Sequence, residues 1–273
     1  MHAEPGPVDA AKQQSQLAAI DRAVTERRAA LHEQKNEAAR GPLFDALMAM
    51  AGEAFRATND EAVTTALTEA EAVLPTPLPN DTPWRARAMN LHRAKGAVAQ
   101  KQGRSADAVT AFESAIAALP SDTEGDRDAL AARLQLLVRM GRSRLAIGQA
   151  SETETEMNQC GSIIESLGAS IPSRALDTVR AAVLSHSGAA LALLGKPDAA
   201  EEKFAASLAL IDRLDSPDLA SLRQQVTALR ADMLSKAGKT SESAAPAAIS
   251  DEPPRDASAG GHDHSHAHGD HHH

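Results

Sequence analysis

The most prominent candidate for chemistry in this chain is a cluster of histidines near its C-terminal end. Seven of the eleven histidines fall within the last twelve residues, HDHSHAHGDHHH. Neutral imidazole is a good ligand for Zn, Ni, Co and Cu, and a flexible segment can bring several rings around one ion. We therefore expect no required cofactor, but a tail able to bind such metals through His262, His264, His266, His268, His271, His272 and His273.

The pattern of this tail distinguishes two interpretations. Purification tags are usually unbroken histidine runs, whereas here Asp, Ser, Ala and Gly separate the rings, which favours a native metal affinity. Alternate spacing without a rigid framework predicts an exchangeable site rather than a structural one. Binding should weaken below about pH 6, because protonated imidazole cannot coordinate a metal.

Signs of catalysis are missing from the rest of the sequence. We find no glycine-rich phosphate loop, metalloprotease helix or nucleophile elbow. His32, His92 and His186 are isolated and are expected to be structural. The single cysteine, Cys160, lies among apolar residues and is expected to fill the core. The sequence thus predicts a protein that is not an enzyme.

Composition points to packed helices and a protein partner. Aromatic residues make up only 2% of the chain, so the core must consist mainly of Ala and Leu, which favour helices over sheets. The net charge is −9, which argues against nucleic acid or an anionic membrane as the main partner. Neither a signal peptide nor a membrane-spanning run is found, which predicts a cytoplasmic protein.

Four segments follow from the pattern of helical blocks and breaks. Residues 1–41 read as a leading long helix, which either caps the first repeat or forms a short coiled coil and hence a homodimer. Residues 42–238 alternate helical blocks with Gly and Pro breaks, and Pro42 suits the first position of a helix. Residues 239–261 read as a disordered linker rich in Ser, Ala, Pro and acid, and 262–273 form the His-rich tail.

An internal repeat is visible when the helical blocks are aligned. Turn positions fall at Thr58, Gly103, Gly148, Gly195 and Gly238, at steps of 45, 45, 47 and 43 residues. Within a unit, small residues are expected to let two antiparallel helices approach closely, and Phe112 and Phe204 are expected to fill the gap between that pair and the next. A regular period in this range is typical of an all-α solenoid.

The unit from His92 to Pro120 resembles the tetratricopeptide repeat (TPR) family. Its Gly96, Gly103, Ala108, Phe112, Ala115 and Pro120 match that family's small, turn, small, aromatic, small and proline positions. The unit around Gly188 and Phe204 is similar, and the one around Gly148 is degenerate. The resemblance implies a right-handed α-solenoid of antiparallel helix pairs, although the period of about 45 residues exceeds the usual ~34.

The resemblance also implies a binding surface along the first helix of each repeat. Arg93, Arg139 and Arg142 of this surface form a basic strip on an acidic protein. Such a strip suits an acidic segment of a protein partner. The family's chaperone-binding clamp is not found. We therefore expect a scaffold or adaptor or, alternatively, a metal-handling accessory protein whose repeats dock a target. The implied groove residues are Asn90, Arg93, Gln100, Gln135, Arg139, Arg142, Ser185 and His186.

Overall fold

The described part of the chain is all-helical. A computed structural model describes residues 15, 18, 21–22, 24–26, 28–29, 37–80, 82–120, 126–168 and 173–238, which belong to one compact unit and contain no strand. The predicted all-α class is confirmed. The main helices are α2 (Glu37–Arg56), α3 (Asp60–Val73), α4 (Thr82–Lys101), α5 (Ser105–Ala117), α6 (Arg127–Ala146), α7 (Ala150–Leu167), α8 (Ser173–Leu193), α9 (Pro197–Leu214) and α10 (Ala220–Lys236).

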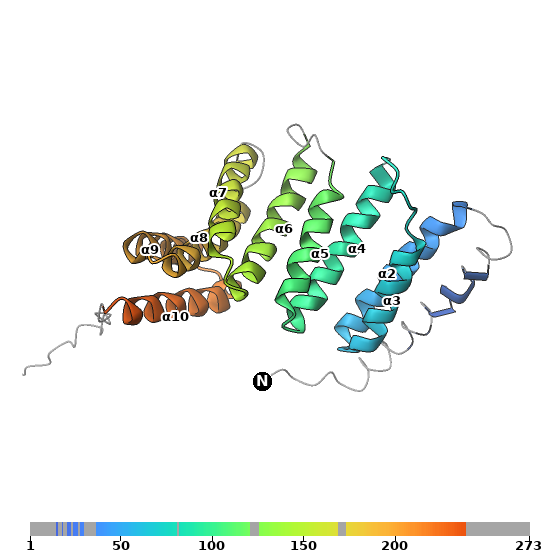
Figure 1. Ribbon diagram of the computed structural model, residues 1–273, viewed down its shortest axis with the longest axis horizontal. Helices are drawn as coiled ribbons and strands as arrows, with labels where there is room; N and C mark the ends of the chain where they lie inside the picture. Colours follow the sequence, from blue (N-terminus) through green and yellow to red (C-terminus); the bar gives the residue numbers. More distant parts are fainter. Residues whose placement is uncertain are drawn as a thin grey trace, which may run out of the picture. The chain divides into compact units, whose positions relative to one another are not determined.

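Neighbouring helices pack in pairs (Figure 1). The most extensive contacts join α2 with α3, α4 with α5, α6 with α7 and α8 with α9, and further contacts link each pair to the next. A short 3₁₀ turn, Pro217–Leu219, precedes α10, which packs mainly on α9. Buried apolar side chains form successive clusters that run from α2 to α10.

The turns within the pairs lie where the sequence predicts them. Thr58, Gly103, Gly148 and Gly195 all have positive φ values, between 55° and 79°. At each of them the next residue's N–H donates to a carbonyl five residues earlier, as in Arg104 to Ala99 at 2.9 Å. This is the hydrogen-bond pattern of a Schellman motif, which ends a helix with a left-handed residue.

Glycines on the first helices make room for large side chains on the second. A Cβ atom built at Gly96 would lie 2.5 Å from the Phe112 ring, and one at Gly188 would lie 2.9 Å from the Phe204 ring. Gly141 stands in the same relation to Met157, at 2.7 Å. Because the glycine and its partner are 16 residues apart in all three pairs, the close approach of the helices is a repeated feature of the fold.

Arginines near the start of several first helices cap the end of the second helix. Arg40 donates to the carbonyl of Val73, and Arg174 donates to that of Leu214. Arg85 reaches three carbonyls at the end of α5, those of Ala117, Ala118 and Leu119, at 3.1, 3.2 and 2.8 Å. These carbonyls lack intrahelical partners, and a cation there is favourable to the helix dipole.

The N-terminal boundary differs from the prediction. α2 begins at Glu37 and continues through Gly41 and Pro42, so the boundary expected between residues 41 and 42 falls inside a helix. Pro42 is the sixth residue of α2 and not the first, as was expected, so the carbonyl four residues earlier has no N–H donor from this position. Upstream, Val24 is 1% exposed within the cluster around α2 and α3, and Arg28 pairs with Glu69 of α3.

Among the helices that the structure describes, none combines the length and the apolarity needed to cross a lipid bilayer.

Candidate protein-binding surface

Three pockets lie along the first helices of the pairs. The α2/α4 pocket, of about 270 Å³, is lined by residues from Met48 to Phe55 of α2 and from Asn90 to Val98 of α4, with Val63, Leu67 and Arg139. The α4/α6 pocket, of about 420 Å³, lies between Phe55, Gln100 and Arg142. The α8/α10 pocket, of about 620 Å³, extends from Arg142 across α8 to Lys236.

These pockets adjoin one another. The α2/α4 and α4/α6 pockets share Phe55, Ala97 and Arg139 in their linings. The α4/α6 and α8/α10 pockets share Arg142 and Ala146. An extended ligand could therefore contact all three pockets in succession.

Six of the eight expected groove residues line this surface. Asn90 and Arg93 line the α2/α4 pocket, and Arg139 lies between that pocket and the next. Arg142 lies between the α4/α6 and α8/α10 pockets, and His186 lines the latter. Gln100 also lines the α4/α6 pocket, but its amide Nε2 donates to the Arg139 carbonyl and to the Ser143 hydroxyl, both at 2.8 Å. Gln100 thus also ties α4 to α6.

The other two expected residues do not line these pockets. Gln135 is exposed on α6 but borders none of the three. Ser185 is 1% exposed, and its hydroxyl is buried without a hydrogen-bond partner among the described residues. Adjacent helical residues point about 100° apart, so Ser185 and His186 cannot both face one groove.

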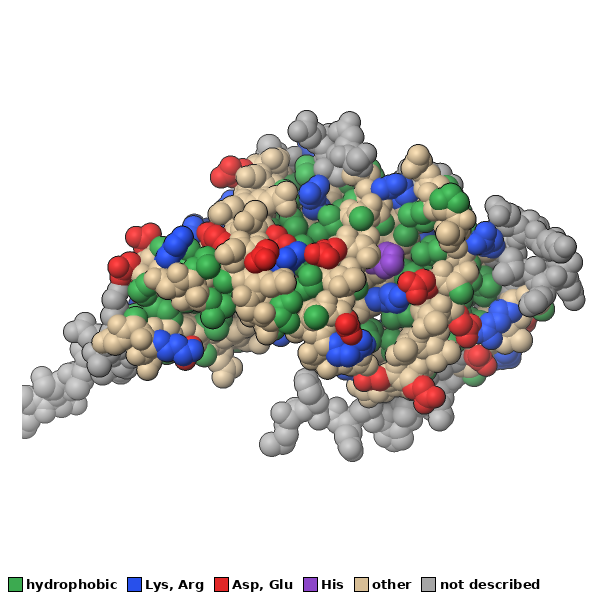
Figure 2. All heavy atoms as spheres, in the orientation of Figure 1, with side chains coloured by type: hydrophobic (Ala, Val, Ile, Leu, Met, Phe, Trp, Pro, Cys, Tyr) green, Lys and Arg blue, Asp and Glu red, His purple; other side chains and the backbone are tan. Residues whose placement is uncertain are grey.

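The α2/α4 and α4/α6 pockets are lined by cations and by no carboxylate. Their cationic side chains are Arg93, Lys101, Arg139 and Arg142. Lys101 lies 3.6 Å from a carboxylate oxygen of Asp60 and over the Phe55 ring. Within the described residues, no ion pair engages the other three guanidinium groups. On the face drawn in Figure 2, by contrast, acidic and basic side chains are interspersed.

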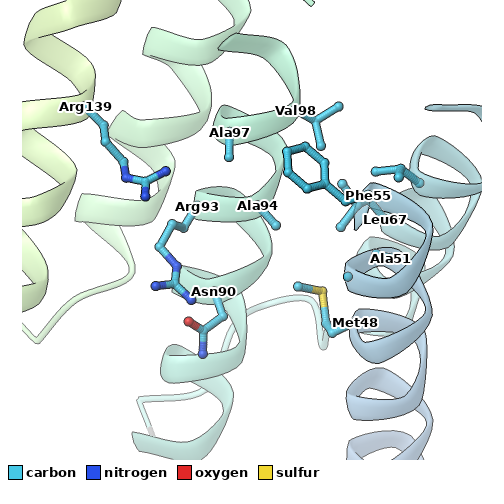
Figure 3. Close-up of a pocket in the computed structure, with 12 residues that line it drawn as sticks. Met48, Ala51, Phe55, Leu67, Asn90, Arg93, Ala94, Ala97, Val98 and Arg139 are labelled. Atoms are coloured by element: carbon cyan, nitrogen blue, oxygen red, sulfur yellow. The ribbon is translucent and has the colours of Figure 1, made fainter. Parts of the chain in front are cut away.

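The α2/α4 pocket also has an apolar side that the sequence analysis missed. Figure 3 shows Asn90, Arg93 and Arg139 on one side, and Met48 and Phe55 of α2 on the other. Phe55 is 36% exposed, whereas the other three phenylalanines of the chain are buried. The available signal was the seven-residue spacing of Met48 and Phe55, which places both on one face of α2.

His186 is a buried histidine in the α8/α10 pocket. It is 8% exposed, and its Nδ1 atom has no hydrogen-bond partner among the described residues. Burial, with a smaller effect from the Arg142 charge, lowers the pKa of His186 to about 4. The ring is therefore neutral at physiological pH and can donate or accept a hydrogen bond.

A partly buried group of charged side chains lies between α5, α6 and α7. Glu156 of α7 pairs with Arg144 of α6 at 2.9 Å, and Arg144 also pairs with Glu113 of α5 at 2.7 Å. Burial raises the pKa of Glu156 to about 7. The charge of Arg144 acts to lower this pKa, and the carboxylates of Glu113 and Glu152 act to raise it further. Burial also raises the pKa of the nearby Cys160 thiol to about 12, so the thiolate needed for nucleophilic chemistry is not formed at neutral pH.

The predicted metal ligands of the tail, His262, His264, His266, His268, His271, His272 and His273, lie outside the described residues. Within residues that the structure does describe, no group of three or more His, Cys, Asp or Glu side chains is arranged to hold a metal ion.

Comparison with known proteins relates the fold, but not the sequence, to a solved structure. No protein-family model and no curated protein matches the sequence at a significant level. The structure is similar to the crystal structure of BtubC (BKLC) from P. vanneervenii, with a TM-score of 0.58 and 14% sequence identity. The match covers 83% of this chain and 85% of that one. This chain therefore shares its helical fold with that protein.

Proposed function

We propose that this chain is a protein–protein interaction scaffold, a TPR-like right-handed α-solenoid that binds an acidic segment of a partner along its concave face. The repeat period of about 45 residues, read from the turn positions, fits the longer helices of such a fold. One observation carries the proposal. Two adjoining pockets present four cations and no carboxylate, in a protein whose net charge is −9.

Charge complementarity gives the ligand its chemistry. Guanidinium groups bind carboxylates through two parallel N–H donors, and such bonds are stronger than neutral ones. Arg93, Arg139 and Arg142 lack ion pairs within the described residues, so a carboxylate of a partner would not have to displace an internal one. The apolar side formed by Met48 and Phe55 would accept an uncharged side chain of the same segment.

A labelled oligoglutamate peptide tests this function on the full chain. Fluorescence anisotropy should detect saturable binding that weakens with added salt. Arg93→Gln and Arg139→Gln should each weaken binding about 3- to 10-fold and should reduce its salt dependence. Arg127→Gln is the matched control, because Arg127 is exposed on the same helix as Arg139 and lines none of the pockets. An equal loss in this control would contradict the proposal.

A metal-handling function is the second candidate. It rests on the seven histidines among the last twelve residues, which could hold Zn, Ni, Co or Cu. Calorimetric titration with Zn and Ni should detect binding to the full chain near pH 7.5 and much weaker binding near pH 5.5. Replacing the seven histidines with serine should abolish it. Unchanged binding in that variant would rule out the tail as the site.

The leading segment is better explained as a cap than as a dimer seam. The burial of Val24 and the ion pair of Arg28 with Glu69 support the cap, because both contacts are made within one chain. A homodimer through this segment stays a prediction that analytical ultracentrifugation can test.

A further inference from the structure

The α8/α10 pocket is larger and more apolar than the α2/α4 and α4/α6 pockets. It is the largest of the three, at about 620 Å³, and falls in the range of about 300–1,000 Å³ typical of small-molecule sites. Its lining is mainly apolar, with side chains from α6, α8, α9 and α10. Its apolar lining includes Leu145, Ala189, Leu193, Phe204, Leu229 and Met233.

The polar groups of this pocket have a net positive charge. Arg142 has no ion pair within the described residues. Asp232 is the one carboxylate in the lining, and it pairs with Lys236 at 2.8 Å. One cation therefore remains without a counter-charge at the junction with the α4/α6 pocket.

His186 adds an unsatisfied polar side chain to the same site. It is 8% exposed, lines the pocket, and leaves its buried Nδ1 without a partner among the described residues. A buried polar group without a hydrogen bond is unfavourable, and a hydrogen bond to a ligand in the pocket would remove that cost. Arg142 lies close enough to affect the proton affinity of the ring, so these two polar groups share one part of the pocket.

An exposed leucine borders the apolar part. Leu193, which ends α8, is 60% exposed, the largest value among the exposed large hydrophobic side chains. It lines the pocket, whereas its neighbour Leu194 does not. Leu193 thus extends the apolar lining of the pocket to its exposed edge, where it can contact a ligand.

We propose that the α8/α10 pocket binds a small amphipathic carboxylate, with its apolar body between α8 and α10 and its carboxylate at Arg142 and His186. A neutral ligand would leave the Arg142 charge unmatched. A polyanion would leave the apolar lining unused. This site is separate from the acidic-peptide surface of the proposed function, although the two share Arg142.

The fluorescent anion 8-anilinonaphthalene-1-sulfonate and the carboxylate decanoate test this site on the full chain. The fluorophore should bind saturably, and decanoate should displace it. Arg142→Gln should weaken the binding of decanoate at least fivefold but should change that of its neutral analogue decan-1-ol less than twofold. Leu193→Gln should weaken both ligands. Circular dichroism verifies that each variant retains its helical content.

Matched variants keep the test specific. Arg93 lies outside this pocket, and Leu194 is next to Leu193 in the chain but does not line the pocket. Arg93→Gln and Leu194→Gln should therefore each change the affinity for decanoate less than twofold. Equal losses in the paired variants, or decan-1-ol binding as tightly as decanoate, would overturn the assignment. So would displacement of the fluorophore by oligoglutamate but not by decanoate. The anisotropy test of the basic strip depends on Arg93 and Arg139, so either proposal can fail without the other.

Discussion

Gly96 of α4 faces the ring of Phe112 of α5 so closely that a Cβ atom at residue 96 would lie 2.5 Å from Cε1 of that ring. Phe112 is fully buried, and Ala108 and Ala115 on the same helix are buried as well. The ring therefore has no empty space into which it could retreat. The distance between the axes of α4 and α5 depends on the absence of a side chain at residue 96.

Gly96→Ala should therefore destabilise the protein by about 1–2 kcal/mol, because overpacking outweighs the gain of up to about 1 kcal/mol in helix propensity. Gly161→Ala is the control, since Gly161 is also in a helix but has no atom within 4 Å of its added Cβ. It should stabilise by about 0.5–1 kcal/mol. Urea unfolding followed by circular dichroism measures both. Destabilisation of the same size in both variants would show that the Phe112 contact is not responsible.

Thr58 is a β-branched residue in the left-handed region, with φ 55°, at a turn where the other pairs have glycine. This conformation costs roughly 1–2 kcal/mol for a residue with a Cβ atom. Thr58→Gly should raise the free energy of unfolding by about 0.5–1 kcal/mol, after the entropy cost of glycine is subtracted. The reverse change, Gly148→Ala, should lower it by about 1 kcal/mol although space for the Cβ is open. Neutral results for both would mean that these turns are unstrained.

Arg85 caps the end of α5 through three carbonyl groups. Arg85→Met keeps the aliphatic stem but removes the donors, and should cost about 1–2 kcal/mol. Arg85→Lys should lose less, because an ammonium group keeps the charge but cannot reach all three acceptors. Thermal unfolding should therefore rank the wild type above the lysine variant and the lysine variant above the methionine variant. Equal midpoints for the lysine and methionine variants would indicate that the charge contributes nothing.

Glu156 should make the stability depend on pH. Its pKa is raised to about 7 in the folded protein from 4.5, so between these values the folded state binds more protons than the unfolded state. The contribution of Glu156 to the free energy of unfolding therefore falls as pH rises from 4.5 to 7. Glu156→Gln imitates the protonated form. It should match the wild type near pH 5 and exceed it by about 1–2 kcal/mol near pH 8.

Urea unfolding of both proteins at pH 5 and pH 8 measures this difference. Glu165→Gln, on an exposed position of the same helix, is the control and should show a much smaller change with pH. A stability difference between wild type and Glu156→Gln that stayed constant from pH 5 to pH 8 would contradict the raised pKa.

The boundaries of the helix pairs could be read from the sequence, because the signals are local. Gly103, Gly148 and Gly195 end helices through hydrogen bonds to carbonyls only a few residues away. Phe112 and Phe204 were identified from their spacing to small residues, but they were expected between pairs, whereas each ring lies against a glycine of its own pair. Pro42 was expected at the first position of a helix but lies inside α2, because a proline that suits a helix start does not prevent the residues before it from being helical.

The binding surface could be predicted only in part. The resemblance to the TPR family implied that Asn90, Arg93, Arg139 and Arg142 share one surface, and these four residues line adjoining pockets. Spacing alone does not give the rotation of one pair against the next, which depends on the packing of whole side chains. For that reason the sequence did not reveal that Ser185 is buried.

The sequence by itself determined the helices, their turns, the positions of the small and large residues in each repeat and the histidine content of the tail. These features depend on residues close together in the chain. Only the tertiary structure decided that Phe55 stays exposed beside the basic strip, and that α8 and α10 enclose an apolar pocket with His186 in its lining. These features depend on how separate helices pack, because a pocket is the space that their side chains leave unfilled.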